Sequence, residues 1–395
     1  MLYALPGTAE AKIQYKSKYD NFIGGKWIAP VKGEYFDVVT PITGKPYTQV
    51  ARSQAEDVEL ALDAAHAAAD KWGKTAPAER SNILLKIADR LEANLEKLAY
   101  AETVDNGKPI RETLNADIPL CIDHFRYFAG VIRADEGGVA ELDENTVSIN
   151  LHEPLGVVGQ IIPWNFPLLM ASWKLAPALA AGCTVVLKPA PDTPFNATRI
   201  GRLIAEKTDI PAGVVNVVTA SDHLVGEELV ISPKVDMISF TGSTAVGQRI
   251  MEKGAATMKR LFLELGGKSA TIVLEDADFA LGCMMGIAPC MHAGQGCANP
   301  TRLLLPRSRY AEGVEILTGI YSGVAPGDPQ DAGTLCGPVI NARQRDRIRG
   351  YINAGIAEGA TLSVGGPEVP DGLETGFYVR PTLFTDVDNS MTIAQ

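Results

Sequence analysis

The sequence predicts an α/β protein with a Rossmann-like parallel-sheet domain, a second α/β domain and a small β excursion between helices. From residue 156 onward, short apolar runs alternate with segments of helical length, which is typical of strand–helix–strand units. The runs are apolar throughout, as in parallel sheets that are covered by helices on both faces. The same alternation resumes after Gly267 and indicates the second α/β domain.

The N-terminal third combines short extended pieces with amphipathic helices. Residues 20–52 consist of strand-like pieces joined by turns, and three stretches then repeat apolar residues at helical spacing. These predicted helical faces lie at 58–72, 84–98 and 118–132.

Residues 138–155 differ from the helices around them. Val147, Ile149 and Leu151 alternate with polar residues, which predicts a half-buried strand. A strand outside the main body exposes an edge, and pairing with another subunit would cover that edge. We therefore expect oligomerisation strands here, with His152 facing solvent.

The alternation after residue 156 defines the elements of the main sheet and of the second domain. Strands are predicted at 157–162, 184–187, 214–218, 235–240, 271–274, 303–305 and 361–364. The helices of the main sheet are predicted at 168–181, 197–208 and 223–230, and a Gly/Pro/Asp-rich loop at 325–338. Ligands of such sheets bind beyond the carboxyl ends of the strands, so chemistry is expected there.

Composition and charge are those of an ordinary globular protein. Of the 395 residues, 46% are apolar and 21% charged, which allows a large core in two or three domains. A net charge of −11 without a basic cluster argues against nucleic acid or an anionic membrane as partner. The N-terminus has no signal-peptide pattern, and no apolar segment reaches the ~20 residues that span a bilayer, so a cytoplasmic location is expected.

The six cysteines are scattered and form no C-x-x-C pair, as expected in a reducing compartment. Cys283, Cys290 and Cys297 recur every seventh residue near His292, which raises the alternative of a metal cluster. Chance helical spacing explains the recurrence better, because no two of these ligands have the close spacing of a metal site. We predict no metal.

Two strand ends carry side chains suited to chemistry. Asn165 follows the first apolar strand, where its amide could donate to a developing oxyanion; a turn asparagine is the alternative. Lys188 ends the next strand before Pro189, where it could contact sugar hydroxyls or phosphate; a surface lysine is the default explanation.

Two further stretches follow. One strand runs into Gly242-Ser243, whose amides could bind a diphosphate at the start of a helix, although such a turn alone is weak evidence. Glu264 and Cys297 then enclose a stretch rich in small residues. A thiolate is a strong nucleophile and a carboxylate can move protons for it, while a buried structural cysteine is the competing explanation.

Taken in order, these pieces resemble the aldehyde dehydrogenase superfamily from about residue 20 to the end of the chain. Any one motif is weak, but all of them in this order leave little room for chance. The matching motifs are Pro163-Trp-Asn-Phe-Pro167, Lys188-Pro189, Phe240-Thr-Gly-Ser-Thr244, Glu264-Leu-Gly-Gly-Lys268, Gly294-Gln-Gly-Cys297 and Gly337-Pro-Val-Ile340.

The resemblance implies oxidation of a small-molecule aldehyde to a carboxylic acid with NAD(P). Cys297 would add to the aldehyde, and Asn165 and the Cys297 amide would hold the oxyanion. Glu264 would activate the water that hydrolyses the resulting thioester. The cofactor residues implied by the resemblance are Ile161, Pro163, Trp164, Lys188, Gly242, Ser243, Val246 and Leu265.

The resemblance also implies a division of the chain and a homo-oligomer. Residues 1–137 and 156–264 would form the NAD(P)-binding domain, residues 138–155 the oligomerisation strands, and residues 265–395 the catalytic domain.

Three positions depart from the family pattern. Pro191 stands where the family often has a glutamate that accepts from the adenosine 2′-hydroxyl. Losing that carboxylate removes a repulsion against a 2′-phosphate, so NAD is expected and NADP could be tolerated. His292 stands where an amide residue is common, and it could tune the thiolate or simply pack. The chain stops at Gln395, where family members continue with a motif that contacts the nicotinamide ribose, so the catalytic domain is expected to be incomplete.

Other hypotheses stay open at this stage. The chain could be a truncated, inactive relative that keeps the fold and nucleotide binding. It could pass the acyl group to coenzyme A, although Glu264 favours water. A Cys–His hydrolase built on His292 and Cys297 would explain none of the other motifs. An uncharged, hydrophobic aldehyde is suggested by the apolar residues Phe166, Met170, Trp173 and Met291.

Overall fold

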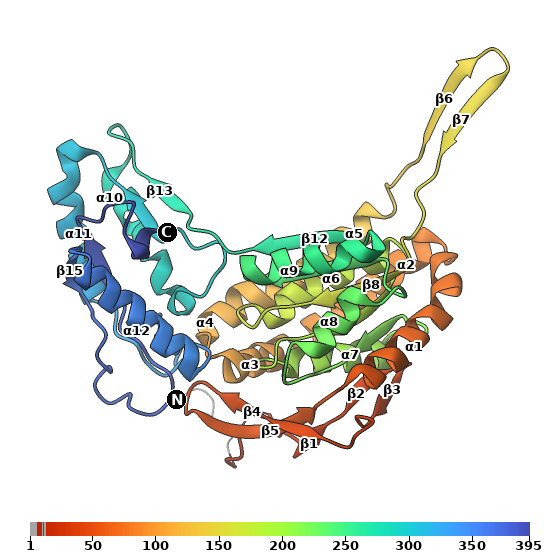
Figure 1. Ribbon diagram of the computed structural model, residues 1–395, viewed down its shortest axis with the longest axis horizontal. Helices are drawn as coiled ribbons and strands as arrows, with labels where there is room; N and C mark the ends of the chain where they lie inside the picture. The colour runs from red at the N-terminus through yellow and green to blue at the C-terminus, as the bar shows by residue number, and fades with distance from the viewer. Residues whose placement is uncertain (1–5, 10, 12) are drawn as a thin grey trace.

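The computed structural model describes residues 6–9, 11 and 13–395 of the chain. It consists of a sheet-centred body, a C-terminal body beside it and a long hairpin arm, with the two bodies forming an open arc (Figure 1). Within the described residues, every helix is too short or too polar to cross a membrane.

A seven-stranded sheet organises the first body. Its strands are β2 (Asn21–Ile23), β3 (Lys26–Ile28), β8 (Val157–Ile161), β9 (Thr184–Lys188), β10 (Val215–Val217), β11 (Met237–Gly242) and β12 (Arg260–Leu265). The order is β12-β11-β8-β9-β10-β2-β3, in which the first five strands are parallel. The prediction of a parallel sheet is confirmed, with the antiparallel hairpin β2–β3 added at one edge.

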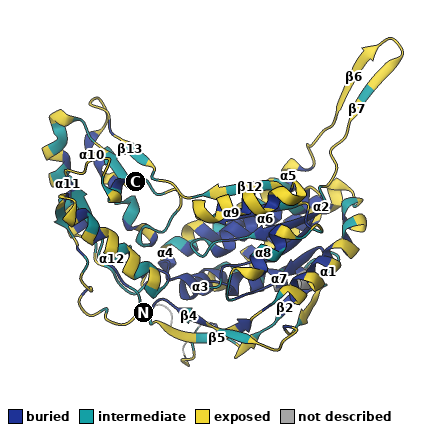
Figure 2. Cartoon of the chain, viewed as in Figure 1, coloured by how far each residue is buried: buried dark blue, intermediate teal, exposed yellow. Residues whose placement is uncertain are grey.

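Helices cover both faces of this sheet, and its central strands β8, β9 and β10 are buried between them (Figure 2). Strand β9 shows the arrangement, because Val185 and Leu187 belong to one apolar cluster and Val186 to the other. The helices that pack on the sheet are α1 (Ala55–Gly73), α6 (Pro167–Ala180), α7 (Phe195–Lys207), α8 (Leu224–Ile231) and α9 (Thr244–Gly254). Helices α2 (Pro77–Glu92), α3 (Leu95–Asn106) and α5 (Ile118–Val131) pack in turn against α6 and α7.

The apolar face predicted at 84–98 is divided between two helices, so that prediction is wrong in its extent. Helix α2 ends at Glu92 and α3 begins at Leu95. Between them, the Asn94 side chain donates to the Arg90 carbonyl across 2.8 Å and helps to end α2. The apolar spacing continues across the break because both helices pack into the same cluster. Before α5 lie the short helix α4 (Ile110–Glu112) and a π-helical turn, η1 (Thr113–Asp117).

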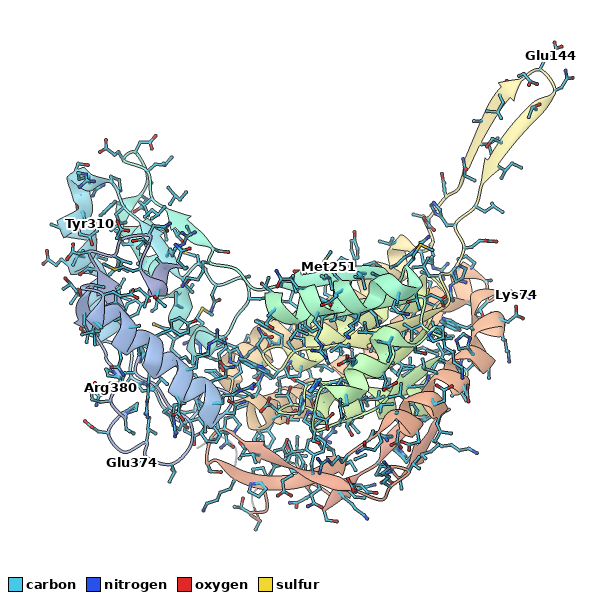
Figure 3. All side chains as sticks on the ribbon, in the orientation of Figure 1. Lys74, Glu144, Met251, Tyr310, Glu374 and Arg380 are labelled. Carbon is cyan, nitrogen blue, oxygen red and sulfur yellow. The ribbon has the colours of Figure 1, made fainter. Side chains whose placement is uncertain are left out.

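The strand predicted to be half buried is exposed on both faces, and that prediction is corrected. It is β7 (Thr146–Asn150), which pairs with β6 (Gly138–Asp143) in an arm that projects from the body with Glu144 at its tip (Figures 1 and 3). No other described element packs on the arm, so its alternating apolar side chains are not covered by the rest of the chain. His152 is exposed, as predicted, and its Nδ1 lies 3.0 Å from Asp135 Oδ1.

The short pieces predicted within 20–52 form strands in two sheets. Besides β2 and β3, a three-stranded sheet contains β1 (Lys18–Tyr19), β5 (Lys45–Ala51) and β4 (Tyr35–Thr40) in that order.

The C-terminal body contains two small sheets. Parallel strands β13 (Ala270–Ile272) and β14 (Arg302–Leu304) form one, and antiparallel strands β15 (Thr361–Val364) and β16 (Leu383–Thr385) form the other. The remaining elements are α10 (Phe279–Met284), η3 (Met285–Gly294), η4 (Arg307–Arg309), α11 (Tyr310–Ser322), α12 (Ala342–Ala357) and η5 (Thr392–Ala394). The strands predicted here are confirmed to within two residues.

Two glycines bring the bodies into close contact. Gly107 follows α3 with φ of 76°, and a Cβ atom there would lie 2.7 Å from the Pro338 ring. A Cβ on Gly337 would lie 2.3 Å from the Gly107 carbonyl oxygen. Beside them, the Ile110 N–H donates to the Pro329 carbonyl across 2.7 Å. Only glycine permits this approach, which sets the C-terminal body against the end of α3.

Candidate active site

Strands β12, β11, β8 and β9 are parallel neighbours, so their carboxyl ends meet at one edge of the sheet. The register places Ile161 opposite Lys188, and Gly242 opposite Leu265. The structure therefore brings together strand ends that lie far apart in the sequence.

Helix α9 begins at this edge. Ser243 is its N-cap residue, and the Ser243 Oγ accepts from the Val246 N–H at 3.4 Å. Gly242 precedes the cap, where a Cβ atom would lie 2.4 Å from the Phe240 ring. The free N–H groups and the positive end of the helix dipole can hold an anionic group here.

Lys188 is buried at 5% exposure, so the default explanation of a surface lysine is wrong. Burial lowers the pKa of Lys188 to about 8, and the carboxylates of Asp222 and Asp192 oppose that shift. A desolvated ammonium is suited to donating hydrogen bonds to ligand hydroxyls.

Asn165 lies between β8 and α6 and connects the two bodies. Its Nδ2 donates to the Gln295 carbonyl oxygen across 2.7 Å. Its own carbonyl oxygen accepts from Asn106 Nδ2 at 3.3 Å. Its Oδ1 is buried and has no partner among the described residues. One hydrogen of Asn165 Nδ2 remains for a further acceptor.

The loop before Cys297 has an unusual backbone. His292, Ala293 and Gly294 follow one another with φ of 46°, 50° and 74°. Two of the three are not glycine, so the loop holds conformational strain that its contacts must offset.

Gln295 supplies three of those contacts. Its main-chain oxygen accepts from Asn165, as described. Its Nε2 donates to the His292 carbonyl at 3.0 Å, and its Oε1 accepts from the Ile340 N–H at 2.9 Å. Gln295 thereby joins the cysteine loop to the oxyanion candidate and to the Gly337-Pro-Val-Ile340 motif.

Cys297 is exposed, whereas the other five cysteines are buried. Glu264 is exposed on β12, opposite Thr241. Nearby, burial lowers the pKa of Lys174 to about 8, and the Glu264 carboxylate opposes the shift. Among the described residues, Cys297 makes no hydrogen bond to Glu264 or His292. The hydrogen bond between Asn165 and Gln295 therefore links the strand-end residues to the loop that carries Cys297.

His292 is 2% exposed, and the geometry around it is that of a packed residue. Its N–H donates to Glu112 Oε1 at 3.1 Å, and its ring centroid lies 6.0 Å from that of Phe166. Burial and the Lys108 ammonium hold the pKa of His292 well below its usual range, so the imidazole is neutral at pH 7. A neutral ring lends no positive charge to a thiolate.

The cysteines of the seven-residue repeat occupy different environments. Cys283 packs with Val273 and Phe279, while Cys290 packs against Tyr321. No three metal-ligating side chains gather anywhere in the part of the chain that is described.

A cavity of about 900 Å³ adjoins the cysteine loop. Its lining includes Trp164 and Gln295 together with residues of α12 and β16. Its lining includes none of Asn165, Glu264 and Cys297, so the cavity is a neighbour of the candidate chemistry and not its centre.

Sequence reasoning missed three supporting residues: Asn106, Lys108 and Gln295. The run Asn106-Gly107-Lys108-Pro109 carries the signature of a helix end, and φ of 76° at Gly107 agrees with it. That signature says nothing about contacts with Asn165. Gln295 lies inside a motif, but spacing alone does not reveal its partners.

Comparison with known proteins identifies the family of the chain. The model of the aldehyde dehydrogenase family matches residues 27–395. An aldehyde dehydrogenase of Deinococcus radiodurans is 52% identical over 100% of this chain and 77% of its own length. A long-chain-aldehyde dehydrogenase of Acinetobacter is 49% identical over 98% of this chain and 78% of its own length.

Solved structures are similar as well. A mutant of aldehyde dehydrogenase C from Pseudomonas syringae, complexed with NAD+ and octanal, superposes with a TM-score of 0.91 at 38% identity, covering 96% of this chain and 77% of that one. The NAD+ complex of a Bacillus cereus aldehyde dehydrogenase has a TM-score of 0.92 at 38% identity, with coverage of 96% and 77%. The resemblance drawn from the motifs is confirmed: the chain belongs to the aldehyde dehydrogenase family.

Proposed function

We propose that this chain oxidises an uncharged, hydrophobic aldehyde to a carboxylic acid with NAD+, through a thioester on Cys297. Oxidation of aldehydes follows from the family. The assignment of steps to residues rests on the arrangement of Asn165, Glu264 and Cys297.

Cys297 starts the reaction as the nucleophile. Its thiolate attacks the carbonyl carbon, and the π electrons of the C=O bond move to oxygen, giving a thiohemiacetal oxyanion. The second hydrogen of Asn165 Nδ2 and the Cys297 main-chain N–H stabilise that oxyanion. NAD+, when bound, supplies the acceptor for the hydride that leaves the carbon, after which a thioester remains on Cys297.

Glu264 serves the second half of the reaction. Its carboxylate takes a proton from water, the hydroxide adds to the thioester carbonyl, and the C–S bond breaks. The products are a carboxylic acid and the regenerated Cys297 thiolate. Glu264 is exposed to solvent on β12, which agrees with a residue that must reach water.

The sheet edge fits a dinucleotide. The capped start of α9 at Ser243 offers N–H groups to a diphosphate, and Lys188 offers a buried donor to ribose hydroxyls. Thr241 Oγ1, on the same strand end, is buried without a partner among the described residues and is free to bind a ligand. Ile161, Pro163, Trp164, Gly242, Val246 and Leu265 complete the proposed cofactor set.

NAD+ is the proposed cofactor although Pro191 replaces the usual glutamate. The carboxylates of Asp192 and Asp222 lie near enough to Lys188 to affect its pKa. Their negative charge would oppose a 2′-phosphate in place of the missing glutamate. The similar Pseudomonas and Bacillus structures both contain NAD+, which supports the same choice.

The arm is proposed as an intersubunit surface of a homo-oligomer. Its large apolar side chains are 56–75% exposed, and they are Val139, Leu142, Val147, Ile149 and Leu151. The same proposal assigns residues 1–137 and 156–264 to NAD binding and residues 265–395 to catalysis. Light scattering after gel filtration should show an oligomer for the wild type and a smaller species for Ile149→Asp; a monomeric wild type contradicts the proposal.

The observation that carries the proposed function is the bond between Asn165 and Gln295, two residues before the exposed Cys297. Cys297→Ala should lower NADH formation from octanal by at least about 10³-fold, while NAD+ binding measured by calorimetry is unchanged. Cys183→Ala, at a buried cysteine in the first body, is the matched control and should keep turnover. A wild-type chain that binds NAD+ without turnover would favour the inactive alternative.

A further inference from the structure

Lys108 is a buried cation for which the proposed chemistry has no use. Its side chain is 0% exposed and its ammonium pairs with Asp117. The Lys108 Nζ also lies 3.4 Å from the centroid of the Phe166 ring. Desolvating an ammonium is expensive, and an apolar residue of similar volume often serves stability as well as a buried ion pair. We therefore expect the buried charge of Lys108 to have a role other than stabilising the fold.

Lys108 contacts the residue that follows the oxyanion donor. Phe166, whose ring it covers, follows Asn165 in the chain. Asn106 Nδ2 donates to the Asn165 carbonyl, and Asn106 Oδ1 accepts from the Lys108 N–H at 2.9 Å. The last residue of α3 thus holds the main chain of Asn165, and Lys108 just after the helix contacts the ring of the next residue.

The same ammonium also affects the carboxylates around the loop. The charge of Lys108 opposes the effect of burial on the pKa of Glu102, Glu112 and Asp117. Glu112 in turn accepts from the His292 N–H at the strained part of the cysteine loop. The charge of Lys108 therefore acts on a carboxylate that contacts the cysteine loop.

We propose that Lys108 is a positioning residue for the oxyanion donor. Its ammonium, stacked on Phe166 and paired with Asp117, holds the Asn165 carboxamide at the place where it can donate to the thiohemiacetal oxyanion. A cation over an aromatic face is most effective when it is desolvated, as it is here. The inference rests on the proposed role of Asn165.

The test is a double-mutant cycle between Lys108→Met and Asn165→Ala. Methionine keeps the length of the side chain and removes the charge. With octanal and NAD+, Lys108→Met should lower kcat/KM by about 30-fold, mostly in kcat, because the oxyanion contact forms in the transition state. In the Asn165→Ala background the same change should lower kcat/KM by less than about twofold, because the group being positioned is absent.

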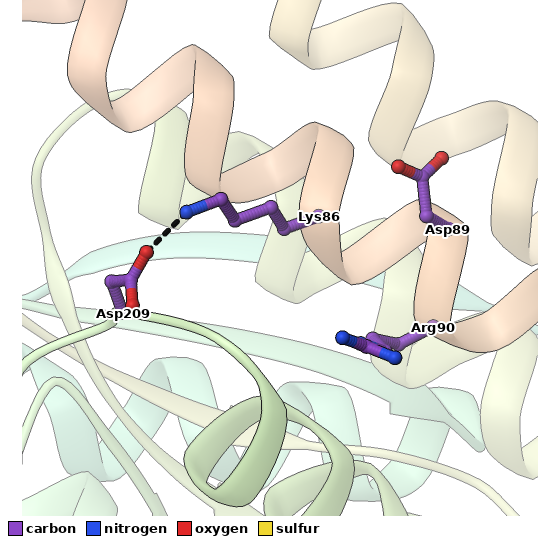
Figure 4. Close-up of a pocket in the computed structure, with 4 residues that line it drawn as sticks. All are labelled: Lys86, Asp89, Arg90 and Asp209. Carbon is purple, nitrogen blue, oxygen red and sulfur yellow. Dashed lines mark hydrogen bonds and ion pairs between the residues drawn. The ribbon is translucent and has the colours of Figure 1, made fainter.

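Two controls separate positioning from folding. Lys86→Met removes an exposed lysine, 52% accessible, that pairs with Asp209 at the surface pocket of Figure 4, and should leave kcat/KM unchanged. Lys108→Met/Asp117→Asn removes both buried charges together. This double variant should regain the thermal stability that Lys108→Met loses, but its kcat should stay low. If Lys108→Met does not fold, the double variant takes its place in the cycle.

Two results would overturn the proposal. One is an equal loss from Lys108→Met in the wild-type and Asn165→Ala backgrounds, which would mean that Lys108 acts on the fold in general. The other is a kcat/KM within twofold of wild type for Lys108→Met. An Asn165→Ala variant with full activity would refute the oxyanion role and with it the proposed function. If Asn165→Ala loses activity but its effect on kcat/KM simply adds to that of Lys108→Met, only the positioning role of Lys108 is refuted.

Discussion

The side-chain amide of Asn165 donates to the main-chain oxygen of Gln295 across 2.7 Å, and this bond ties the end of β8 to the loop that carries Cys297. The two residues lie on different bodies of the molecule. The geometry of the candidate site therefore depends on how firmly Gln295 is itself held.

Removing the Gln295 side chain should loosen that loop. Gln295→Ala leaves the Ile340 N–H without its partner and removes one of the two hydrogen bonds that the His292 carbonyl accepts from Gln295. We expect a loss of about 1–3 kcal/mol of stability and a fall in kcat/KM of about 10–100-fold. Thermal unfolding and steady-state kinetics measure the two effects. Gln295→Glu, which keeps the acceptor for Ile340, should lose less stability; equal losses would argue against this account.

Gly242→Ala should impair cofactor binding, because the added Cβ would lie 2.4 Å from the Phe240 ring at the start of α9. We expect Kd for NAD+ to rise by about tenfold or more and stability to fall by about 1–3 kcal/mol, as in other overpacked sites. Gly319→Ala, in α11 with open space around it, is the matched control. It should stabilise the protein by about 0.5–1 kcal/mol. An unchanged Kd in Gly242→Ala would show that this turn is not at the cofactor.

Asp222→Asn should increase the use of NADP+. The change removes one negative charge near Lys188 and keeps the oxygen that accepts from the Leu224 N–H at 2.9 Å. We expect the ratio of kcat/KM for NADP+ to that for NAD+ to rise by about tenfold, equivalent to about 1.4 kcal/mol. Asp209→Asn, at the surface pair with Lys86, should leave the ratio unchanged. A ratio that stays constant in Asp222→Asn would contradict a role for this carboxylate in cofactor choice.

His292 should make the fold sensitive to acid. Its pKa in the folded chain lies well below the unfolded value of about 6.5, so its stabilising contribution is present above that pH and is lost as the pH falls. Wild type should therefore lose about 2 kcal/mol relative to His292→Asn between pH 7 and pH 5. Denaturant unfolding at each pH checks this, and parallel pH profiles would contradict it.

The contribution of Glu112 to stability should change with pH in the opposite direction. Burial raises its pKa to about 7, so its contribution is fully present below about pH 4.5 and is lost as the pH rises through 7. Relative to Glu112→Gln, which keeps an oxygen for the His292 N–H, wild type should lose on the order of 2 kcal/mol between pH 5 and pH 8. The same denaturant series measures it, and a difference that grows with pH would be the wrong sign.

The parallel sheet and the residues at its strand ends could be predicted from the sequence, because continuous apolar strands between helices have few other arrangements. The break at Asn94 could not, because two helices that share one cluster keep the same apolar spacing. The exposure of β7 could not either, since alternation shows which residues share a face and not whether anything covers it.

Lys108 shows why the candidate site could not be predicted completely from the sequence. A lysine after a helix-ending glycine is expected at the surface, yet the Lys108 side chain is fully buried. Its side-chain partners Asp117 and Phe166 come together around it only in the folded chain.

The central claim is that Cys297 carries the acyl group and Glu264 promotes its hydrolysis. The most direct test is intact-protein and peptide mass spectrometry of Glu264→Gln after mixing with octanal and NAD+. The account predicts one equivalent of NADH and an octanoyl thioester that accumulates on the peptide containing Cys297. An unmodified Cys297 peptide after NADH has formed, or an acyl group on another residue, would contradict it.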